Sequence, residues 1–382
     1  MTPAPAPPIP HLLLPTPPGR PSTDRTLEHR ARQGELLRLR RGVYVDTAAF
    51  FSAYPSQQHL LAAAATAAVK RRPVFCRETS LAVHGVPMLQ VPNAVHLRTF
   101  RSSRAGASGA SLPQLPTQHR ELQHLLKQAQ FSSELIRRRF QALAERRVVA
   151  PIPTGYHRAQ ATAAYRNREL QLPLGPPAQF FRDLLAPGQL TQAESLTFSV
   201  IDTVARMELA DAIVVLDAVL GGRVPGHRAL ATQDFAPWLD FLGPQRMKDR
   251  WDQLIAFADG AAESVGESWS RAVMHTLGFP APILQANFQL PRGDTARTDF
   301  YWPDLGLVGE FDGRMKYSRS RVLSGLDPGE VVFQEKLREE ALSELGLRVV
   351  RWVWDDLKSP QQLADRLLRA GLPQTDRTGS LR

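Results

Sequence analysis

The sequence predicts a multi-domain α/β protein, with a mostly helical N-terminal half followed by a C-terminal domain built on a mixed central sheet. The chain has 382 residues, which is more than one ordinary core accommodates and suggests two or three domains. Its hydrophobic content of 43% is normal for a globular chain. From Gly266 onward, helix-period and strand-period segments follow in the order helix, three antiparallel strands, helix, strand, and the last strand is predicted over RVVRWVWDDL, residues 348–357. These observations together indicate the α/β class.

The charge of the chain points to an anionic partner. Its 47 Lys and Arg against 37 Asp and Glu give a formal charge of +10, and arginine dominates the cations. Because the guanidinium group makes bidentate contacts to phosphate, DNA is the first partner to consider. The alternative is an organism whose proteins are generally rich in arginine.

The N-terminus and the single cysteine limit where the protein acts. Cys76 alone permits neither an intramolecular disulfide nor a cysteine-rich zinc site. Residues 1–21 are rich in proline and lack the basic start and apolar stretch of a secretory signal, so we expect a flexible leader. With no apolar run of about 18 residues, we expect a cytoplasmic protein without membrane contacts.

A basic hairpin follows the leader. Ser22, Thr23 or Asp24 is expected to cap a helix that runs to about Gln33, and the next strands break at Arg41–Gly42. A helix followed by a basic hairpin is typical of the end of a winged helix-turn-helix. The alternative is a solvated hairpin that contacts nothing. The arginines expected to contact DNA here are Arg38, Arg40 and Arg41.

The order of the next segments resembles a known family. RRGVYV, an Ala-rich helix at 57–69, CRETSLAVHGVPML and the strand VHLRT together resemble the AbiEi-type antitoxin family of transcriptional regulators. The resemblance covers about residues 23–100 and resumes in the helices of 197–222. It implies a winged helix, an antitoxin domain at 22–100 closed by residues 191–245, and a cognate toxin as partner. The Pro-rich leader occupies the space of the two helices that usually precede the recognition helix.

Residues 101–190 are predicted to be a linker and a basic helical insertion. The stretch 101–116 is rich in Ser, Gly and Ala, and two helices are expected around Phe131–Ser133. The second helix carries Arg137 and Arg138, which we expect to bind DNA; the alternative is a solvated charged face. Residues 150–190 show no strong periodicity and are left unassigned.

The C-terminal domain is predicted at 246–372, followed by a flexible tail at 373–382. Within this domain, the segment TDFYWPDLGLVGEFDG contains several carboxylates. Asp299 lies on one predicted strand, and Glu310 and Asp312 share a face of the next because strands alternate with period two. Acids inside apolar strands are costly to bury, and they repel one another unless a cation lies among them. Oxygen ligands favour Mg²⁺, with Mn²⁺ as the alternative.

This region resembles the PD-(D/E)XK nuclease superfamily. More closely, ESWSRAVMHTLGFPAPILQ, TDFYWPDLGLVGEFDG and EKLREEALSELGLRVVRWVWDDL resemble an uncharacterised bacterial family related to very-short-patch-repair endonucleases, over about residues 263–357. The resemblance implies a restriction-endonuclease-like fold and metal-dependent cleavage of DNA. Carried onto this sequence, Asp299 and Glu310 would be metal ligands, and Glu267 an outer or water-mediated ligand.

One position departs from the superfamily pattern. Asp312 stands where a lysine usually positions the attacking water, so Lys316 and Lys336 are the candidates for that role, with Arg338 as a DNA contact. For each residue a structural alternative is open. Asp312 would be part of a turn with Gly313, Glu267 a helix N-terminal acid, and the cations of the later helix solvated.

The function predicted from these features is DNA binding with a Mg²⁺-dependent endonuclease domain. The alternative is an AbiEi-like regulator or antitoxin whose degenerate nuclease fold serves binding only. A third hypothesis is an antitoxin that binds a toxin protein, with the basic charge incidental. DNA sequence preference and oligomeric state are not indicated.

Overall fold

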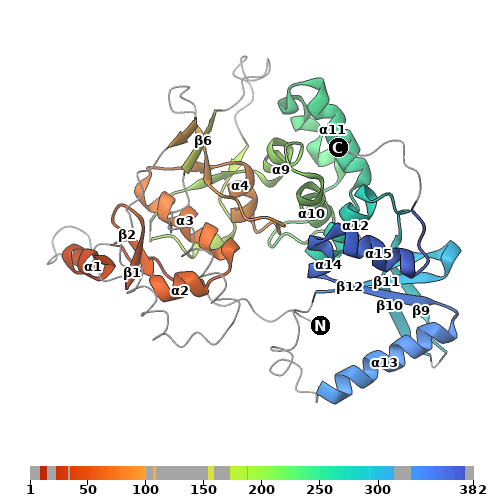
Figure 1. Ribbon diagram of the computed structural model, residues 1–382. Helices are drawn as coiled ribbons and strands as arrows, with labels where there is room; N and C mark the ends of the chain where they lie inside the picture. The colour runs from red at the N-terminus through yellow and green to blue at the C-terminus, as the bar shows by residue number, and fades with distance from the viewer. Residues whose placement is uncertain are drawn as a thin grey trace.

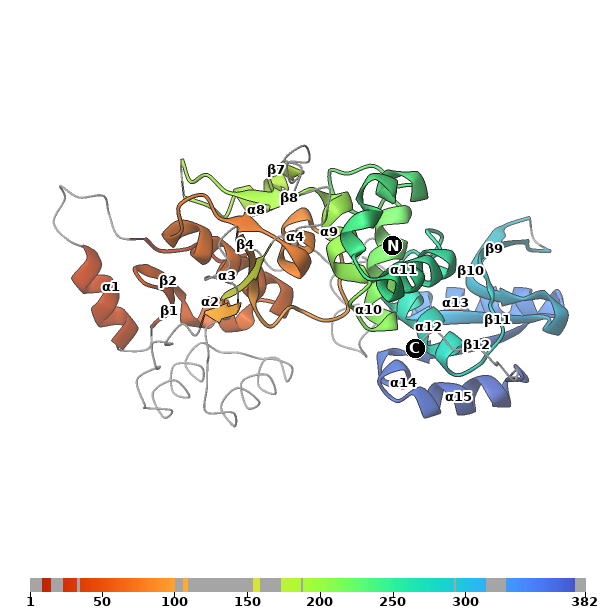
Figure 2. The same ribbon diagram turned by 90° about the horizontal axis from the view of Figure 1, so that it is seen from above.

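The computed structural model describes residues 9–14, 23–32, 35–99, 106–108, 154–158, 173–186, 188–291, 293–313 and 328–374. Within this part of the chain, none of the helices combines the length and apolar character needed to cross a membrane. Seen from above, the N-terminal hairpin lies at one end of the molecule and the C-terminal sheet at the other (Figure 2).

The N-terminal unit is a helix followed by a hairpin, as predicted. Helix α1 (Thr23–Arg32) precedes strands β1 (Leu36–Arg40) and β2 (Val43–Asp46), which pair antiparallel. Gly42 has φ 71°, a conformation that glycine adopts without strain, and it forms the turn. The carboxylate of Asp46 then accepts a hydrogen bond from the Ala49 amide and caps α2 (Thr47–Ser52).

A six-stranded sheet forms the centre of the molecule. Helices α3 (Pro55–Val69) and α4 (Arg77–His84) pack against its strands, and α9 (Leu196–Val204) packs on α4. The strand order of the sheet is β5-β6-β4-β3-β8-β7. The bounds of these strands are β3 Val74–Phe75, β4 Val95–Thr99, β5 Gly106–Ser108, β6 Thr154–Arg158, β7 Leu174–Gly175 and β8 Gln192–Glu194. Strands β3 and β8 run parallel, and each leads into a helix. The range 150–190, which had no assigned structure, thus supplies β6, β7 and the short helix α8 (Gln179–Arg182).

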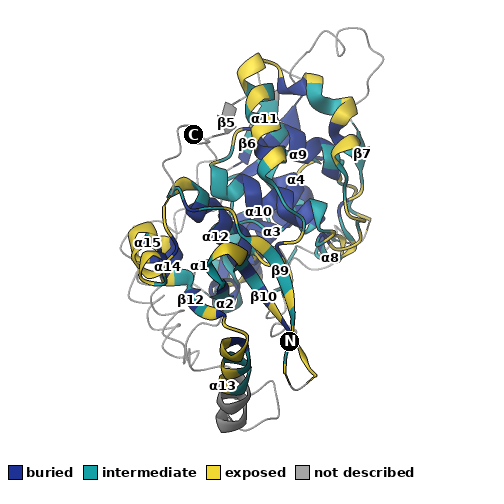
Figure 3. Cartoon of the chain, turned by 90° about the vertical axis from the view of Figure 1, so that its right-hand side faces the viewer, coloured by how far each residue is buried: buried dark blue, intermediate teal, exposed yellow. Residues whose placement is uncertain are grey.

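The helices after the sheet enclose the largest apolar core. Helix α9 is followed by α10 (Leu209–Leu220), the 3₁₀ segment η2 (Thr232–Leu242) and α11 (Gln245–Phe257). Phe235 and Trp251 meet edge to face in this core. The interior faces of α4, α9 and α10 are buried, whereas the outer face of α11 is exposed (Figure 3). The helices predicted within 197–222 are confirmed.

The C-terminal unit has the predicted order of helix, three antiparallel strands, helix and parallel strand. The elements are α12 (Val265–Thr276), β9 (Ile283–Gln289), β10 (Thr295–Trp302), η3 (Pro303–Leu305), β11 (Leu307–Asp312), α13 (Pro328–Glu344) and β12 (Arg348–Val353). The strand order is β12-β11-β10-β9, and only β11 and β12 are parallel. The prediction of a strand through Leu357 was wrong. The carboxylate of Asp356 accepts a hydrogen bond from the Val353 amide and begins helix α14 (Trp354–Lys358), which precedes α15 (Pro360–Arg369).

Helices cover both faces of this C-terminal sheet (Figure 1). On one face, α12, α14 and α15 pack against Phe300, Trp302 and Trp352. On the other, Leu342 of α13 packs with Ala296 and Val308. Helix α12 also packs on α10, where the Arg271 guanidinium lies 2.6 Å from the buried Asp217 carboxylate. The helix that carries Glu267 is therefore anchored in the preceding helical core.

Candidate functional site

Glu267 is held at the start of α12, next to the sheet. The Ser264 hydroxyl caps the helix by accepting a hydrogen bond from the Glu267 amide. The Glu267 side chain is 7% exposed, and its Oε2 accepts hydrogen bonds of 2.8 Å from the Gln285 amide group and the Glu263 backbone. Gly266 lets the helix approach β11, since a Cβ there would lie 1.9 Å from Phe311 Cε1. The acid is therefore buried and oriented.

Asp299 is an acid of the site whose pKa is raised. It lies on β10, and its Oδ2 accepts a 2.8 Å hydrogen bond from the Phe311 amide of β11. Burial, followed by the negative charge of Glu267, raises the pKa of Asp299 to about 6; Glu310 adds to this rise, and the Phe311 hydrogen bond and Arg338 oppose it. Glu267 and Glu310 are therefore near enough to Asp299 for their charges to act on its carboxylate, and Glu310 lies on the paired strand β11.

Gln285 belongs to this site and was not predicted. Its φ of 53° is unusual for a residue other than glycine in a strand and costs roughly 1–3 kcal/mol. The pairs Thr298–Ala286 and Phe300–Leu284 flank it, so the register places it opposite Asp299. Its amide group donates to Glu267. The strained backbone thus coincides with a side chain that orients an acid, a combination that sequence patterns do not reveal.

Glu310 is paired with two arginines. Its Oε1 lies 2.7 Å from Arg338 of α13, and its Oε2 lies 3.0 Å from Arg351 of β12. Arg351 is opposite Glu310 in the parallel register and also forms an ion pair with Glu339. Glu310 therefore has its counter-charge within the protein, in contrast to Asp299.

The other predicted catalytic residues lie elsewhere. Asp312 is exposed at the end of β11, and Lys336 is exposed on α13. Arg338, two residues further along that helix, is the cation that reaches an acid of the site. Lys316 lies outside the described residues.

Oxygen donors at the site suit Mg²⁺ or Mn²⁺, but the acids do not form a closed metal cage. Among the described residues, no three His, Cys, Asp or Glu side chains are grouped so as to hold a metal ion. Mg²⁺ is commonly bound by one or two carboxylates with several waters. The raised pKa of Asp299 fits such a cation, because a positive charge there would stabilise the carboxylate. Asp299 with Glu310 would hold it, with Glu267 beyond.

The predicted DNA-binding arginines of the hairpin differ in environment. Arg40 donates hydrogen bonds to the Thr66 and Thr154 hydroxyls, so its guanidinium is used inside the protein. Arg41 is exposed at the turn, and Arg38 is partly buried on β1. Arg137 and Arg138 lie outside the described residues.

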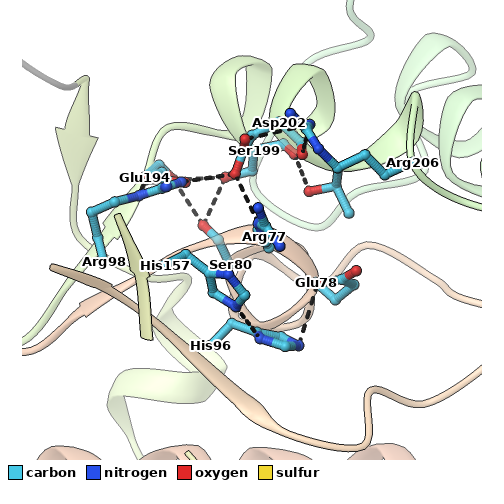
Figure 4. A network of polar contacts seen from close by, with 11 residues as sticks. Arg77, Glu78, Ser80, His96, Arg98, His157, Glu194, Ser199, Asp202 and Arg206 are labelled. Carbon is cyan, nitrogen blue, oxygen red and sulfur yellow. Dashed lines mark hydrogen bonds and ion pairs between the residues drawn. The ribbon is translucent and has the colours of Figure 1, made fainter. Parts of the chain in front are cut away.

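A second polar cluster lies in the central unit and was also missed (Figure 4). Arg98 of β4 is 2.6 Å from Glu194 of β8 and 2.8 Å from Asp202 of α9. Arg77 and Arg206 lie 3.4 and 3.5 Å from the same Asp202. Burial raises the pKa of Glu194 to about 7, against the opposing effect of Arg98. We call these five residues the arginine cluster.

A histidine pair borders the arginine cluster. His96 Nδ1 and His157 Nε2 are 2.7 Å apart, and His96 Nε2 is 3.4 Å from Glu78. Burial lowers the pKa of both imidazoles, that of His157 to about 3. The two histidines are 61 residues apart in the sequence, so local spacing does not reveal the pair. His84 is also buried.

Comparison with known proteins identifies only partial similarity. Two uncharacterized proteins from two strains of Mycobacterium tuberculosis are each 37% identical to this chain over 118 residues. The match covers 31% of this chain and 40% of each relative, so it spans less than half of either protein. No family model matches the chain. No solved structure matches it either.

Proposed function

We propose that the protein is a divalent-cation-dependent DNA endonuclease whose site is formed by Glu267, Asp299 and Glu310. The observation that carries this proposal is the partly buried Asp299 carboxylate on β10, the strand paired with the one that carries Glu310; its pKa is raised by burial and by the charges of Glu267 and Glu310. A carboxyl group whose pKa is raised well above its ordinary value, beside further carboxylates, is a mark of functional sites. A divalent cation would offset the electrostatic repulsion among these carboxylates.

The order of elements supports a restriction-endonuclease-like domain. A helix carrying an acid, three antiparallel strands with Asp299 and Glu310 on the inner pair, a helix and a parallel strand match the resemblance to nucleases noted above. DNA as substrate is supported by the formal charge of +10. A winged helix at the N-terminus, and a toxin protein as a further partner, are supported by the AbiEi-like sequence alone.

Each of these side chains would have a separate role in the cleavage of DNA. Asp299 and Glu310 would hold the cation, and Gln285 would keep Glu267 oriented toward it. When bound, Mg²⁺ lowers the pKa of a coordinated water and stabilises negative charge on the phosphoryl oxygens. Arg338 on α13 would supply positive charge in place of the lysine that Asp312 replaces.

The test is a plasmid-nicking assay with Mg²⁺, Mn²⁺ or chelator. We expect cation-dependent nicking by the wild type, and a loss of about 10²-fold or more in Asp299→Asn and Glu310→Gln, a range typical of removing a group that stabilises the transition state. Asp304→Asn is the matched control, because Asp304 is an exposed acid of the same unit. Nicking that persists in both site variants would refute the proposal.

A second candidate is DNA binding without cleavage, as in a transcriptional regulator. It is favoured by the two arginines on Glu310, which neutralise that acid without a metal. In that case nicking would be absent under all cation conditions, while DNA affinity would still fall steeply with salt through counterion release. An affinity independent of salt would instead favour a protein partner.

A further inference from the structure

We propose that Arg338 binds a DNA phosphate, and that Glu310 holds the Arg338 guanidinium in an ion pair until a divalent cation binds the Glu310 carboxylate in its place. This inference rests on the proposed function and adds a coupling between cation binding and DNA binding. The starting observation is that each oxygen of Glu310 faces a guanidinium, at 2.7 Å for Arg338 and 3.0 Å for Arg351. A cation that ligates Glu310 must therefore compete with an arginine.

Arg338 is the arginine that is easier to displace. It lies on α13, its side chain is 36% exposed, and its guanidinium also donates to the backbone carbonyl of Arg297. Arg351 projects from β12 beside Glu310 in the parallel register, and Glu339 gives it a second acidic partner. A partly exposed ion pair on a long side chain contributes only about 0–1 kcal/mol, so a bound cation can offset its loss.

The release requires only a side-chain movement. Helix α13 is fixed to the sheet one turn beyond Arg338, where Leu342 is fully buried against Ala296 and Val308. The flexible stem of the arginine can therefore rotate while the helix stays in place.

The freed guanidinium would lie beside the proposed reaction centre. In the ion-paired position it already contacts β10 at the backbone carbonyl of Arg297, two residues before Asp299. Guanidinium groups bind phosphate oxygens in a bidentate manner. With the cation on Glu310, the positive charge of Arg338 has lost its acidic partner and can bind the DNA phosphate that approaches the cation.

The test is a calorimetric titration with Mn²⁺ in the absence of DNA. We expect Arg338→Gln to bind Mn²⁺ about tenfold more tightly than the wild type, because the competing guanidinium is gone. Arg369→Gln is the matched control, since this exposed arginine lies on α15 over the opposite face of the sheet, and its affinity should equal that of the wild type. Arg338→Lys, which keeps the charge, should fall between.

A second readout measures the coupling. With Ca²⁺ present in place of Mg²⁺, Arg338→Gln should bind duplex DNA more weakly, with a log–log salt slope smaller by about 0.9, as expected for one lost phosphate contact. By reciprocity, DNA should tighten Mn²⁺ binding in the wild type more than in the variant. Equal Mn²⁺ affinities in wild type, Arg338→Gln and Arg338→Lys would overturn the inference and leave the endonuclease proposal standing. Absence of Mn²⁺ binding in all of them would overturn both.

Discussion

The two polar clusters of this protein differ in how the charges of their acids are neutralised. In the arginine cluster of the central unit, three guanidinium groups surround Glu194 and Asp202 and link strands β4 and β8 with helices α4 and α9. In the C-terminal unit, three acids gather and only Glu310 has arginine partners. Asp299 is left with a raised pKa.

Under the proposed function, this difference separates a structural network from a site that takes a cation from solution. A buried acid with a guanidinium partner is neutralised within the chain, and its removal should affect mainly folding. A buried acid beside other acids is stabilised by a cation from solution, and its removal should affect mainly binding and catalysis. Four changes would test this distinction.

The largest effect on stability is expected for Arg98→Met. It would leave Glu194, which is fully buried, without its guanidinium, and breaking such a pair costs about 3–5 kcal/mol. Urea unfolding should show this loss, and the double variant with Glu194→Gln should recover part of it. A loss below about 1 kcal/mol would show that the cluster is not a structural network.

Gly266→Ala is expected to cost about 1–3 kcal/mol, because the new methyl group would overlap Phe311 in the closely packed contact between α12 and β11. The measurement is the denaturant midpoint, with Phe311→Leu in the same background as the control that makes room. If alanine is tolerated without Phe311→Leu, the close approach of the Glu267 helix to the strand is not required.

Asp299→Asn should stabilise the protein at pH 8, by about 1–3 kcal/mol. Because burial and Glu267 raise the folded-state pKa from 3.8 to about 6, the folded state binds more protons than the unfolded state between these values. Wild-type stability from this group is therefore present below about pH 4 and lost as the pH rises through 6, whereas the variant lacks this dependence. Thermal unfolding from pH 4 to 8 measures the difference, and Mg²⁺ should raise the melting temperature of the wild type only. Parallel pH profiles would contradict the assignment.

The smallest change is expected for Gln285→Gly. Glycine relieves the positive φ by roughly 1 kcal/mol but loses the hydrogen bond to Glu267, worth about the same. Net stability should change by less than about 1 kcal/mol, whereas Gln285→Ala, which keeps the strain and loses the bond, should be less stable than the glycine variant. If the alanine variant is as stable as the glycine variant, the strain at this position is negligible.

Local patterns in the sequence were enough to predict several elements of secondary structure. The turn at Gly42, the end of α4 at Gly85 and the strands that carry Asp299 and Glu310 follow from short-range rules on glycine, capping and alternation. The pattern failed at Trp354, where apolar alternation continues but the Asp356 side chain begins a helix.

By itself, the sequence determined the α/β class, the order of the C-terminal elements, and the two acids whose burial in apolar strands requires a purpose. The tertiary structure alone decided which polar side chains meet: Gln285 with Glu267, Arg338 with Glu310, and His96 with His157. The physical reason is the distance along the chain over which each kind of interaction acts. Backbone geometry is set by neighbours a few residues away, whereas the free energy of a buried charge depends on groups within a few ångströms in space, which the chain brings from distant positions.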